Sequence, residues 1–520
     1  MNLKVWLIRL LQGLLAAAAI AMIVVGLSVF GVIDLPVFDI GSTVQENGTS
    51  TVRVTRQNVI KNPTYQQFLA EGDTALYRGN FVKALEAYQQ ASELEPKEVG
   101  PYEKIGDVFF LQKKYESALQ NFELAEALNP SGVFIKIKTV RSLLGMRKII
   151  DAKTKVGAIA PPSQTSLYYQ GLIAAFLNDQ NASKDLLTKS LTAGADENLK
   201  SNAQKFLTIY RDFELARDAK TEYLQAQLAQ GFDQVGENGL AIELAFDAIK
   251  TQHDYRDVWI ILGHAFLNEE KWLDAEDSLA KAIDLDASHP AAFFYRGMAR
   301  RNLQKQADAI LDFESALKLG WQPRIAAKLQ LADIYFDRSD FAKAYPLYKE
   351  VATTDASEIR RFIRPMALAI NHLQLPKEAL ELGQKAYDAH PDTAMGENLL
   401  GWGLFANGDL IGARQHLQAA IKRDPELAAA YLNLGQLAEK EGNRQDALQQ
   451  YELAIEFSQK SGDDSITETA RTRRGVLESA NVSSGTSTPV PMPLVPLPAP
   501  APAPQNQPQP QQTTPSLSLL

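Results

Sequence analysis

Small apolar residues recur at three positions along most of this chain, and the step between recurrences is 34 or 35 residues in most cases. The most regular position is alanine in ten of eleven occurrences, which are Ala84, Ala118, Ala152, Ser183, Ala241, Ala275, Ala309, Ala344, Ala379, Ala413 and Ala447. A second position follows seven residues later, from Ala91 to Ala454, and a third precedes the first by twelve residues, from Gly72 to Gly435. Because small side chains on one helix face let a second backbone approach closely, the pattern predicts closely packed helical repeats.

The last repeat, residues 431–458, indicates what each unit folds into. One helix face is predicted from apolar residues at i, i+3, i+4 and i+7, which are Tyr431, Leu434, Gly435 and Ala438. The facing stripe of a second helix is formed by Ala447, Tyr451 and Ala454. We expect Asp424 as N-cap and Pro425 as the first helical residue, with Gly442 and Asn443 left-handed between the helices. Such a hairpin leaves its outer faces uncovered, so it needs neighbours of the same kind.

These repeats resemble the tetratricopeptide repeat (TPR) family, whose units follow W-x2-L-G-x2-Y…A-x3-F-x2-A…P. Trp259-Ile-Ile-Leu-Gly263 and Tyr102-Glu-Lys-Ile-Gly106 carry the resemblance well. It implies an all-α fold, a right-handed α-solenoid of about eleven helix-turn-helix units over residues 65–458. In two units the pattern fails, because Gly383 replaces an aromatic residue and the unit around Ala152 lacks the glycine. We expect those units to pack loosely.

The sequence predicts seven segments in chain order. They are a cytoplasmic N-terminus with a transmembrane helix (1–33), a stalk (34–62), a first block of about four repeats (63–197), a helical insertion (198–221), a second block of about seven repeats (222–458), a capping helix (459–480) and a disordered proline-rich tail (481–520). The insertion follows from the step between Ser183 and Ala241, which is 58 residues. Phe206, Tyr210 and Phe213 within it have helical spacing, so we expect one long helix that forms a joint between the blocks.

Residues 10–33 form a run of 24 residues without a charge, long enough as a helix to span about 36 Å and cross a bilayer. Lys4 and Arg9 precede the run, and acidic residues follow it. The positive-inside rule therefore predicts a single-pass plasma-membrane protein with a cytoplasmic N-terminus and extracytoplasmic repeats. The alternative is a cleaved signal peptide with a small-residue site at Ala19-Ile-Ala21. The repeats are exported under either prediction.

The C-terminal tail contains no charged residue after Glu478 and has eleven prolines between Pro489 and Pro515. Polyproline II is the expected conformation of such a segment, which cannot form a core. We expect it to act as a spacer, as a ligand for an aromatic-lined groove on another protein, or as both.

Composition and motifs argue against several function classes. The net charge of −9 argues against nucleic-acid binding, and the absence of cysteine excludes disulfides, thiol catalysis and cysteine metal sites. We find no phosphate-binding glycine loop, HExxH, G-x-S-x-G, EF-hand loop or dinucleotide fingerprint, and the six histidines lie in different repeats. The expectation is a protein that is not an enzyme and has no cofactor, catalytic residue or metal site.

Binding is the better prospect, because TPR arrays resemble one another in holding peptides in a concave groove lined by the first helices. The corresponding positions here include Tyr168, Leu172, Ala175, Phe294, Met298, Arg301, Leu329, Asp333, Phe336, Asn398, Trp402 and Phe405. Aromatics with a few polar groups suit an extended or helical segment with apolar anchors. The alternative is that these aromatics pack against adjacent hairpins.

Seven cations make the third unit basic, and they are Lys136, Lys138, Arg141, Arg147, Lys148, Lys153 and Lys155. We interpret them as a solvated face, with a membrane or an acidic partner as the alternative. A lysine/asparagine clamp for a terminal carboxylate, used by TPR proteins that bind chaperone tails, is absent from the first three units. The sequence as a whole predicts a bacterial, membrane-anchored scaffold for proteins or peptides, while a reader of the tail could be a further partner. The alternative is an envelope spacer that engages the cell wall.

Overall fold

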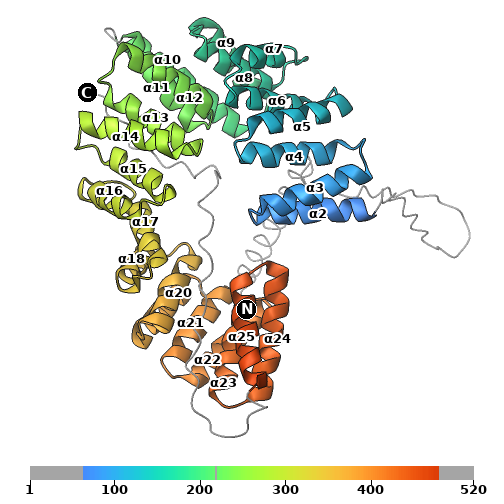
Figure 1. Cartoon of the computed structure of the whole chain (residues 1–520), viewed down its shortest axis with the longest axis vertical. Helices are drawn as coiled ribbons and strands as arrows, with labels where there is room; N and C mark the ends of the chain where they lie inside the picture. The colour runs from blue at the N-terminus through green and yellow to red at the C-terminus, as the bar shows by residue number, and fades with distance from the viewer. Residues whose placement is uncertain (1–62, 217–219, 480–520) are drawn as a thin grey trace, which may run out of the picture. The chain divides into compact units, whose positions relative to one another are not determined.

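The computed structural model describes residues 63–216 and 220–479 (Figure 1). The predicted transmembrane helix, stalk and proline-rich tail lie outside the described residues. Within the described ranges, no helix combines the length and apolar character needed to cross a membrane.

Eleven helical hairpins follow one another in chain order, and no strand occurs in the part of the chain that the structure describes. The hairpins are α2 (Pro63–Tyr77) with α3 (Phe81–Leu94), α4 (Val99–Leu111) with α5 (Tyr115–Leu128), α6 (Val133–Gly145) with α7 (Ile149–Gly157), α8 (Gln164–Phe176) with α9 (Gln180–Thr192), α11 (Thr221–Gln234) with α12 (Asn238–Thr251), α13 (Arg256–Asn268) with α14 (Trp272–Leu285), α15 (Pro290–Asn302) with α16 (Gln306–Lys318), α17 (Arg324–Asp337) with α18 (Phe341–Thr354), α19 (Ile363–Ala367) with α20 (Pro376–Ala389), α21 (Ala394–Ala406) with α22 (Leu410–Arg423), and α23 (Ala428–Lys440) with α24 (Arg444–Ser461). The prediction of an all-α repeat solenoid is confirmed.

Each hairpin reverses direction through one residue with a left-handed backbone. These residues are Gly79, Lys113, Arg147, Asn178, Gly236, Glu270, Gln304, Ser339, Gln374, Gly408 and Gly442. Seven of them carry a side chain, although a left-handed backbone costs an L-residue roughly 1–2 kcal/mol. The same turn is therefore kept in all eleven units even where the sequence lacks glycine.

Glycines on the first helices lie directly against a large side chain sixteen residues later on the second helix. A Cβ placed on Gly435 would lie 2.5 Å from Tyr451 Cε1, and one on Gly263 would lie 2.4 Å from Leu279 Cγ. The same contact joins Gly72 to Tyr88, Gly106 to Phe122, Gly171 to Leu187, Gly297 to Phe313 and Gly401 to Leu417. The small-residue position found in the sequence thus sets the distance between the two helices of these hairpins.

Three details of the predicted last unit are wrong. Asp424 is the C-cap of α22 rather than the N-cap of α23, whose N-cap is Leu427. Pro425 is not the first helical residue, because α23 begins at Ala428. Asn443 is not left-handed, because it has φ −84° and its side chain accepts from the backbone N–H of Asp446 as the N-cap of α24. Gly442 alone, with φ 79°, makes the reversal.

The ninth unit packs tightly, contrary to the expectation from Gly383. A Cβ on Gly383 would lie 2.7 Å from the carbonyl oxygen of Leu399, so α20 and α21 touch backbone to backbone there. Gly403 on α21 makes the reciprocal approach, at 3.0 Å from the carbonyl oxygen of Ala379. An aromatic side chain at position 383 would separate these helices. The third unit does not show loose packing at the substituted glycine either, because Val140 is fully buried.

The first helix of the ninth unit is irregular. A 3-10 turn (Ile359–Phe362), the short α19 and a π-helical turn (Leu368–His372) replace one continuous α-helix. Pro365 lies in α19 and has no N–H to donate to the helical ladder, which is a common cause of such irregularity.

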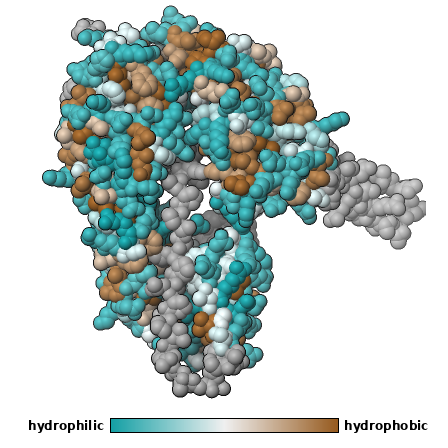
Figure 2. All heavy atoms as spheres, in the orientation of Figure 1, coloured by the Kyte–Doolittle hydropathy of each residue, from teal (hydrophilic) through white to brown (hydrophobic). Residues whose placement is uncertain are grey.

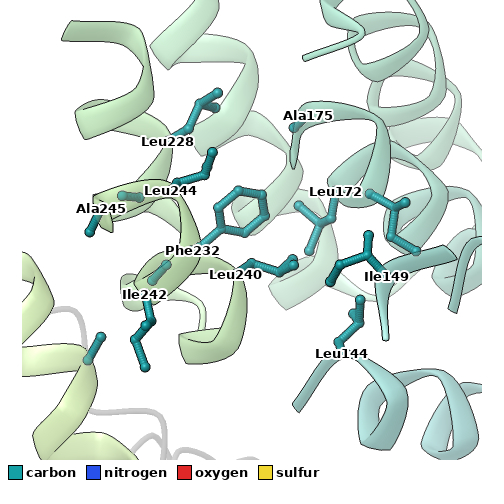
Figure 3. Close-up of a cluster of buried hydrophobic side chains, with 14 of the residues drawn as sticks. Leu144, Ile149, Leu172, Ala175, Leu228, Phe232, Leu240, Ile242, Leu244 and Ala245 are labelled. Carbon is teal, nitrogen blue, oxygen red and sulfur yellow. The ribbon is translucent and has the colours of Figure 1, made fainter. Parts of the chain in front are cut away.

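One long helix occupies the insertion, namely α10 (Glu197–Leu215), and Ala203, Phe206 and Tyr210 on it are buried. These residues belong to a hydrophobic cluster that includes side chains from Leu119 to Ala299. Figure 3 shows part of this cluster, where Leu144 and Leu172 approach Leu240 and Phe232 from a later unit. A polar helix, α25 (Asp464–Ser479), packs on α24 after the last hairpin.

The left-handed turns predict opposite effects of glycine and alanine at equivalent positions. Gly442→Ala should lower the stability of the chain by about 1 kcal/mol, because alanine must adopt the strained conformation. Gln304→Gly at the same turn of the seventh unit should leave stability unchanged or raise it. Urea unfolding of the full chain, followed by circular dichroism, measures both midpoints. Equal losses in the two variants would contradict the common turn.

The glycine contact predicts strong coupling between positions 435 and 451. Gly435→Ala should cost about 1–3 kcal/mol, because its methyl group overlaps the Tyr451 ring. In Tyr451→Ala chains the same change should cost far less, since the ring is gone. A double-mutant cycle on urea midpoints tests this, and additive effects would show that the two residues do not set the hairpin distance.

Candidate binding surface on the first helices

The first helices of successive units touch one another, as α11 with α13, α13 with α15, α15 with α17, α21 with α23 and α23 with α25. We call the side on which they do so the inner face. It is the surface on which the sequence placed the candidate binding residues.

Carboxylates on the inner face pair with cations 31 residues later, on the next first helix. The distances are 2.8 Å for Asp73 and Lys104, 2.7 Å for Asp107 and Lys138, and 2.8 Å for Asp333 and Arg364. The sequence analysis did not find these bridges, although their constant spacing of 31 residues is visible in the sequence. They join the first, second and eighth units to the units that follow.

In two of these bridges the carboxylate also accepts a hydrogen bond from a tyrosine, which lies fifteen residues later on the second helix of the same unit. Tyr88 donates to Asp73 at 2.6 Å and Tyr348 donates to Asp333 at 2.5 Å. Burial and the adjacent carboxylate raise the pKa of each phenol above its usual range, so both stay protonated donors. Phe122 stands at the equivalent place in the second unit, where Lys138 lies 5.7 Å from the ring centroid.

Three predicted residues come together around Arg364, which the sequence analysis missed. The Arg301 guanidinium donates to Asp333 at 3.3 Å and to Gln330 at 2.5 Å. Arg364 lies over the Phe336 ring, 5.3 Å from its centroid. Arg301, Asp333 and Phe336 are each only half-buried, so this cluster can offer a cation, a carboxylate and an aromatic edge to a partner.

Six other predicted residues are buried, which favours the packing alternative for them. They are Tyr168, Leu172, Ala175, Phe294, Asn398 and Trp402, with at most 9% of any of them exposed. Phe294 stacks on Trp321 with ring centroids 4.4 Å apart, and Leu172 lies in the cluster of Figure 3. These side chains leave little surface for a partner. Met298 and Phe405, by contrast, are half-buried at the edges of hydrophobic clusters.

The inner face between the third and fifth units is filled by the chain itself, because α6 contacts α12. A Cβ on Gly239 would lie 2.7 Å from the carbonyl oxygen of Leu144, so the two backbones meet there. Tyr169 donates to the buried Glu237 at 3.1 Å, and Arg141 lies 3.7 Å from the same carboxylate. Burial raises the pKa of Glu237, and Arg141 offsets this only in part.

Most cations of the basic third unit are neutralised within the chain. Lys138 pairs with Glu103 and Asp107, Arg141 lies beside Glu237, Arg147 pairs with Glu243 at 2.8 Å and Lys155 pairs with Glu126 at 2.9 Å. Glu103, Asp107 and Glu126 lie in the second unit, whereas Glu237 and Glu243 lie in the turn and the second helix of the fifth unit. The basic unit therefore fastens its neighbours together rather than presenting all its charge to a membrane or an acidic partner.

Amide side chains line the inner face of the last two units. Asn433 on α23 donates to Asn398 on α21 at 2.9 Å. Gln436, one turn further along α23, is 7% exposed, and its side chain makes no hydrogen bond within the described part of the chain. We call Asn398, Trp402, Phe405, Asn433, Gln436 and Arg473 the amide strip.

Apolar residues on the outside do not form a competing surface. Val82, Ile150, Leu273 and Ile411 are exposed at the same position of four different units. Figure 2 shows apolar residues scattered among hydrophilic ones on the face that it draws. Scattered exposure of this kind is normal for soluble domains. Among the described residues, no group of His, Cys, Asp and Glu could hold a metal ion.

The contact between His264 and Asp233 predicts a pH-dependent stability. Burial lowers the pKa of His264, but the Asp233 carboxylate, 2.6 Å from Nδ1, outweighs it, and the net pKa is raised. A histidine whose pKa is raised on folding stabilises the folded chain at pH values below its unfolded pKa of about 6.5. This stabilisation is lost as the pH rises through the folded pKa. Urea midpoints should therefore fall as the pH rises from about 6 to 8, and fall less in His264→Gln. The exposed His253→Gln is the control, and an unchanged slope in His264→Gln would contradict the assignment.

Comparisons with known proteins agree with the repeat architecture. Residues 69–133, 262–322 and 398–463 match the tetratricopeptide repeat family. Stress-induced-phosphoprotein 1 of Caenorhabditis elegans is 27% identical over 199 residues, which are 38% of this chain and 61% of that relative. This chain thus matches less than two thirds of the relative's length.

Solved structures of similar chains include yeast Tom70 and YrrB. Tom70 is 15% identical, with a TM-score of 0.28 over 80% of this chain and 96% of that chain. YrrB, described as a TPR protein with an unusual peptide-binding site, is 20% identical, with a TM-score of 0.27 over 44% of this chain and 99% of that chain. The matched segments and the helical hairpins together support the assignment of this chain's repeats to the tetratricopeptide repeat family.

Proposed function

We propose that the chain is a membrane-anchored scaffold that binds a protein or peptide partner on its inner face, on the extracytoplasmic side of the plasma membrane. The observation that carries this proposal is the half-buried group of Met298, Arg301, Asp333, Phe336 and Phe405 on the first helices of the seventh, eighth and tenth units. Aromatic and arginine side chains that are partly exposed are typical anchors of protein interfaces. The binding region is the seventh to tenth units, because the chain itself fills the inner face between the third and fifth units.

A partner segment would meet two kinds of group on this surface. Phe336 and Phe405 offer apolar edges, while Arg301 already shares its guanidinium between Gln330 and Asp333. An approaching carboxylate would compete with Asp333 for Arg301, and an approaching cation would compete with Arg301 for Asp333. The paired charges therefore favour a partner segment with apolar anchors and few net charges.

The membrane part of the proposal is supported by the uncharged run at 10–33 and the charges on either side of it. A spacer that engages the cell wall is the second candidate function, supported by the eleven prolines of the tail. A spacer would not depend on the inner face. The two functions therefore differ in their response to substitutions there.

Substitutions on the inner face should weaken partner capture. In Met298→Gln with Phe405→Gln, we expect recovery of the partner after in-cell crosslinking to fall by about tenfold, because two apolar anchors are lost. Ile411→Gln is the matched control, since Ile411 is 76% exposed on the second helix of the tenth unit. Quantitative mass spectrometry compares the three chains. Equal recovery from all of them would favour the spacer.

Membrane topology can be tested because the chain contains no cysteine. Tyr77→Cys replaces a side chain that is 94% exposed. A membrane-impermeant maleimide should label it in cells with an intact plasma membrane, whereas Lys4→Cys should be labelled only after permeabilisation. The opposite pattern would place the repeats in the cytoplasm and contradict the proposed topology.

A further inference from the structure

Units that are not neighbours in the chain meet through a small polar cluster on the inner face. The Tyr115 hydroxyl at the start of α5 lies 2.8 Å and 2.9 Å from the two carboxylate oxygens of Glu269, the C-cap of α13. Tyr169 on α8 donates to Glu237 at 3.1 Å, and Arg141 on α6 lies 3.7 Å from the same carboxylate. We call these five residues the clasp, which joins the second, third and fourth units to the fifth and sixth.

Repeat stacking does not require the clasp. In a solenoid each repeat needs to contact only the units before and after it. Tyr115 and Glu269, by contrast, belong to the second and sixth units and lie 154 residues apart in the chain. Separation of the clasp would therefore leave each hairpin with the neighbours on which it stacks.

Apolar contacts favour the closed arrangement. A Cβ on Gly239 would lie 2.7 Å from the carbonyl oxygen of Leu144, so α6 and α12 touch backbone to backbone. Leu144 and Leu240 are buried in one hydrophobic cluster, as Figure 3 shows. Opening would expose part of this apolar surface to water, which opposes it.

The charged groups of the clasp oppose closure, because they are buried with incomplete hydrogen bonding. Arg141 Nε is buried without a hydrogen-bond partner, and 3.7 Å is too long for it to donate to Glu237. Glu237 is 8% exposed, and Tyr169 is the one donor to its carboxylate within the described part of the chain. A buried ion pair in this geometry does not regain the hydration that both groups lose. Closure is therefore a balance between apolar contact and the loss of water around two charges.

The charge on Glu237 depends on groups from several elements. The titratable and charged groups that face it are Tyr115 on α5, Arg141 on α6, Tyr168 and Tyr169 on α8, Lys113 in the turn before α5, and Glu269 at the end of α13. Burial raises the pKa of Glu237, and Arg141, Tyr169 and Lys113 offset this only in part. The pKa values of the three phenols are raised as well, so the phenols stay neutral donors.

The sign of the pH effect follows from the raised pKa of Glu237. A carboxyl group whose pKa is raised on closure binds a proton more readily in the closed arrangement. This contribution to closure is fully present below the pKa of the hydrated carboxyl, about 4.3, and is lost as the pH rises through the pKa of the closed arrangement.

We propose that the clasp opens and closes without unfolding of the repeats, and that it closes more firmly as the pH falls. Opening would uncover the inner face where α6 meets α12. This inference does not depend on the proposed scaffold function, because the clasp joins parts of one chain and needs no partner and no membrane.

Distances between two spin labels in the full chain test the proposal. Because the chain contains no cysteine, Lys153→Cys on α7 and Asp247→Cys on α12, both exposed, can carry the labels. Double electron–electron resonance should show a short and a long distance, and the ratio of the long to the short population should rise roughly 3- to 10-fold from pH 5 to pH 8. Asp247→Cys with Leu273→Cys, in the consecutive fifth and sixth units, is the control pair and should keep one distribution.

Two substitutions connect the distances to the clasp. Glu237→Gln keeps an acceptor for Tyr169 but cannot titrate, so the pH dependence should disappear. Arg141→Met leaves the Glu237 carboxylate without its cation, so the long population at pH 8 should rise a further 3- to 10-fold, roughly. At pH 5, where Glu237 is closer to being protonated, the effect of Arg141→Met should be smaller.

Three outcomes would overturn the proposal. One distance distribution at every pH in the unaltered chain would show that α6 and α12 are joined permanently. A pH dependence that persists in Glu237→Gln would assign the effect to another group. Longer distances accompanied by a loss of helical circular dichroism would indicate unfolding of repeats rather than opening of the clasp.

Discussion

The distance between the two helices of seven hairpins depends on the contact between a glycine and the side chain sixteen residues later. Glycine faces a ring or a leucine in seven units, as Gly435 faces Tyr451. Where the first residue is larger, the second is mostly smaller, as in the pairs Val140 with Val156, Ala229 with Ala245 and Ala367 with Gly383. The pair is not constant in size, because Ala332 with Tyr348 is larger and the space at Gly383 is filled by the carbonyl oxygen of Leu399 in the next unit. Close packing of this kind makes the hairpins similar enough to stack.

Much of the fold could be predicted from the sequence, because small residues and helical periodicity are local signals. The hairpins and their buried stripe, including Ala447, Tyr451 and Ala454, are as predicted. The tight contact at Gly383 was not predicted, because the atom that fills its space is the backbone oxygen of Leu399 in the next unit. Helix ends such as Asp424 were misplaced, since aspartate also satisfies backbone groups in turns.

The candidate surface was less predictable, because groove positions are shared by buried and accessible side chains. Periodicity placed Leu172 and Phe336 on the same side of their helices, but only the three-dimensional contacts show that Leu172 is sealed and Phe336 is half-buried. The closure between α6 and α12 joins residues about a hundred positions apart, such as Arg147 and Glu243. No repeat pattern signals a contact at that separation. The contact between α6 and α12 divides the inner face into a part that holds the chain together and a part that remains accessible.

The central claim is that partners bind the accessible part of the inner face. Hydrogen–deuterium exchange of the full chain, with and without a partner recovered by crosslinking, tests it most directly. We predict that the partner slows exchange in α15, α17 and α21, with no change in α6 or α12 beyond their existing protection. Slower exchange confined to the second helices, or to the α6 and α12 region, would contradict the account.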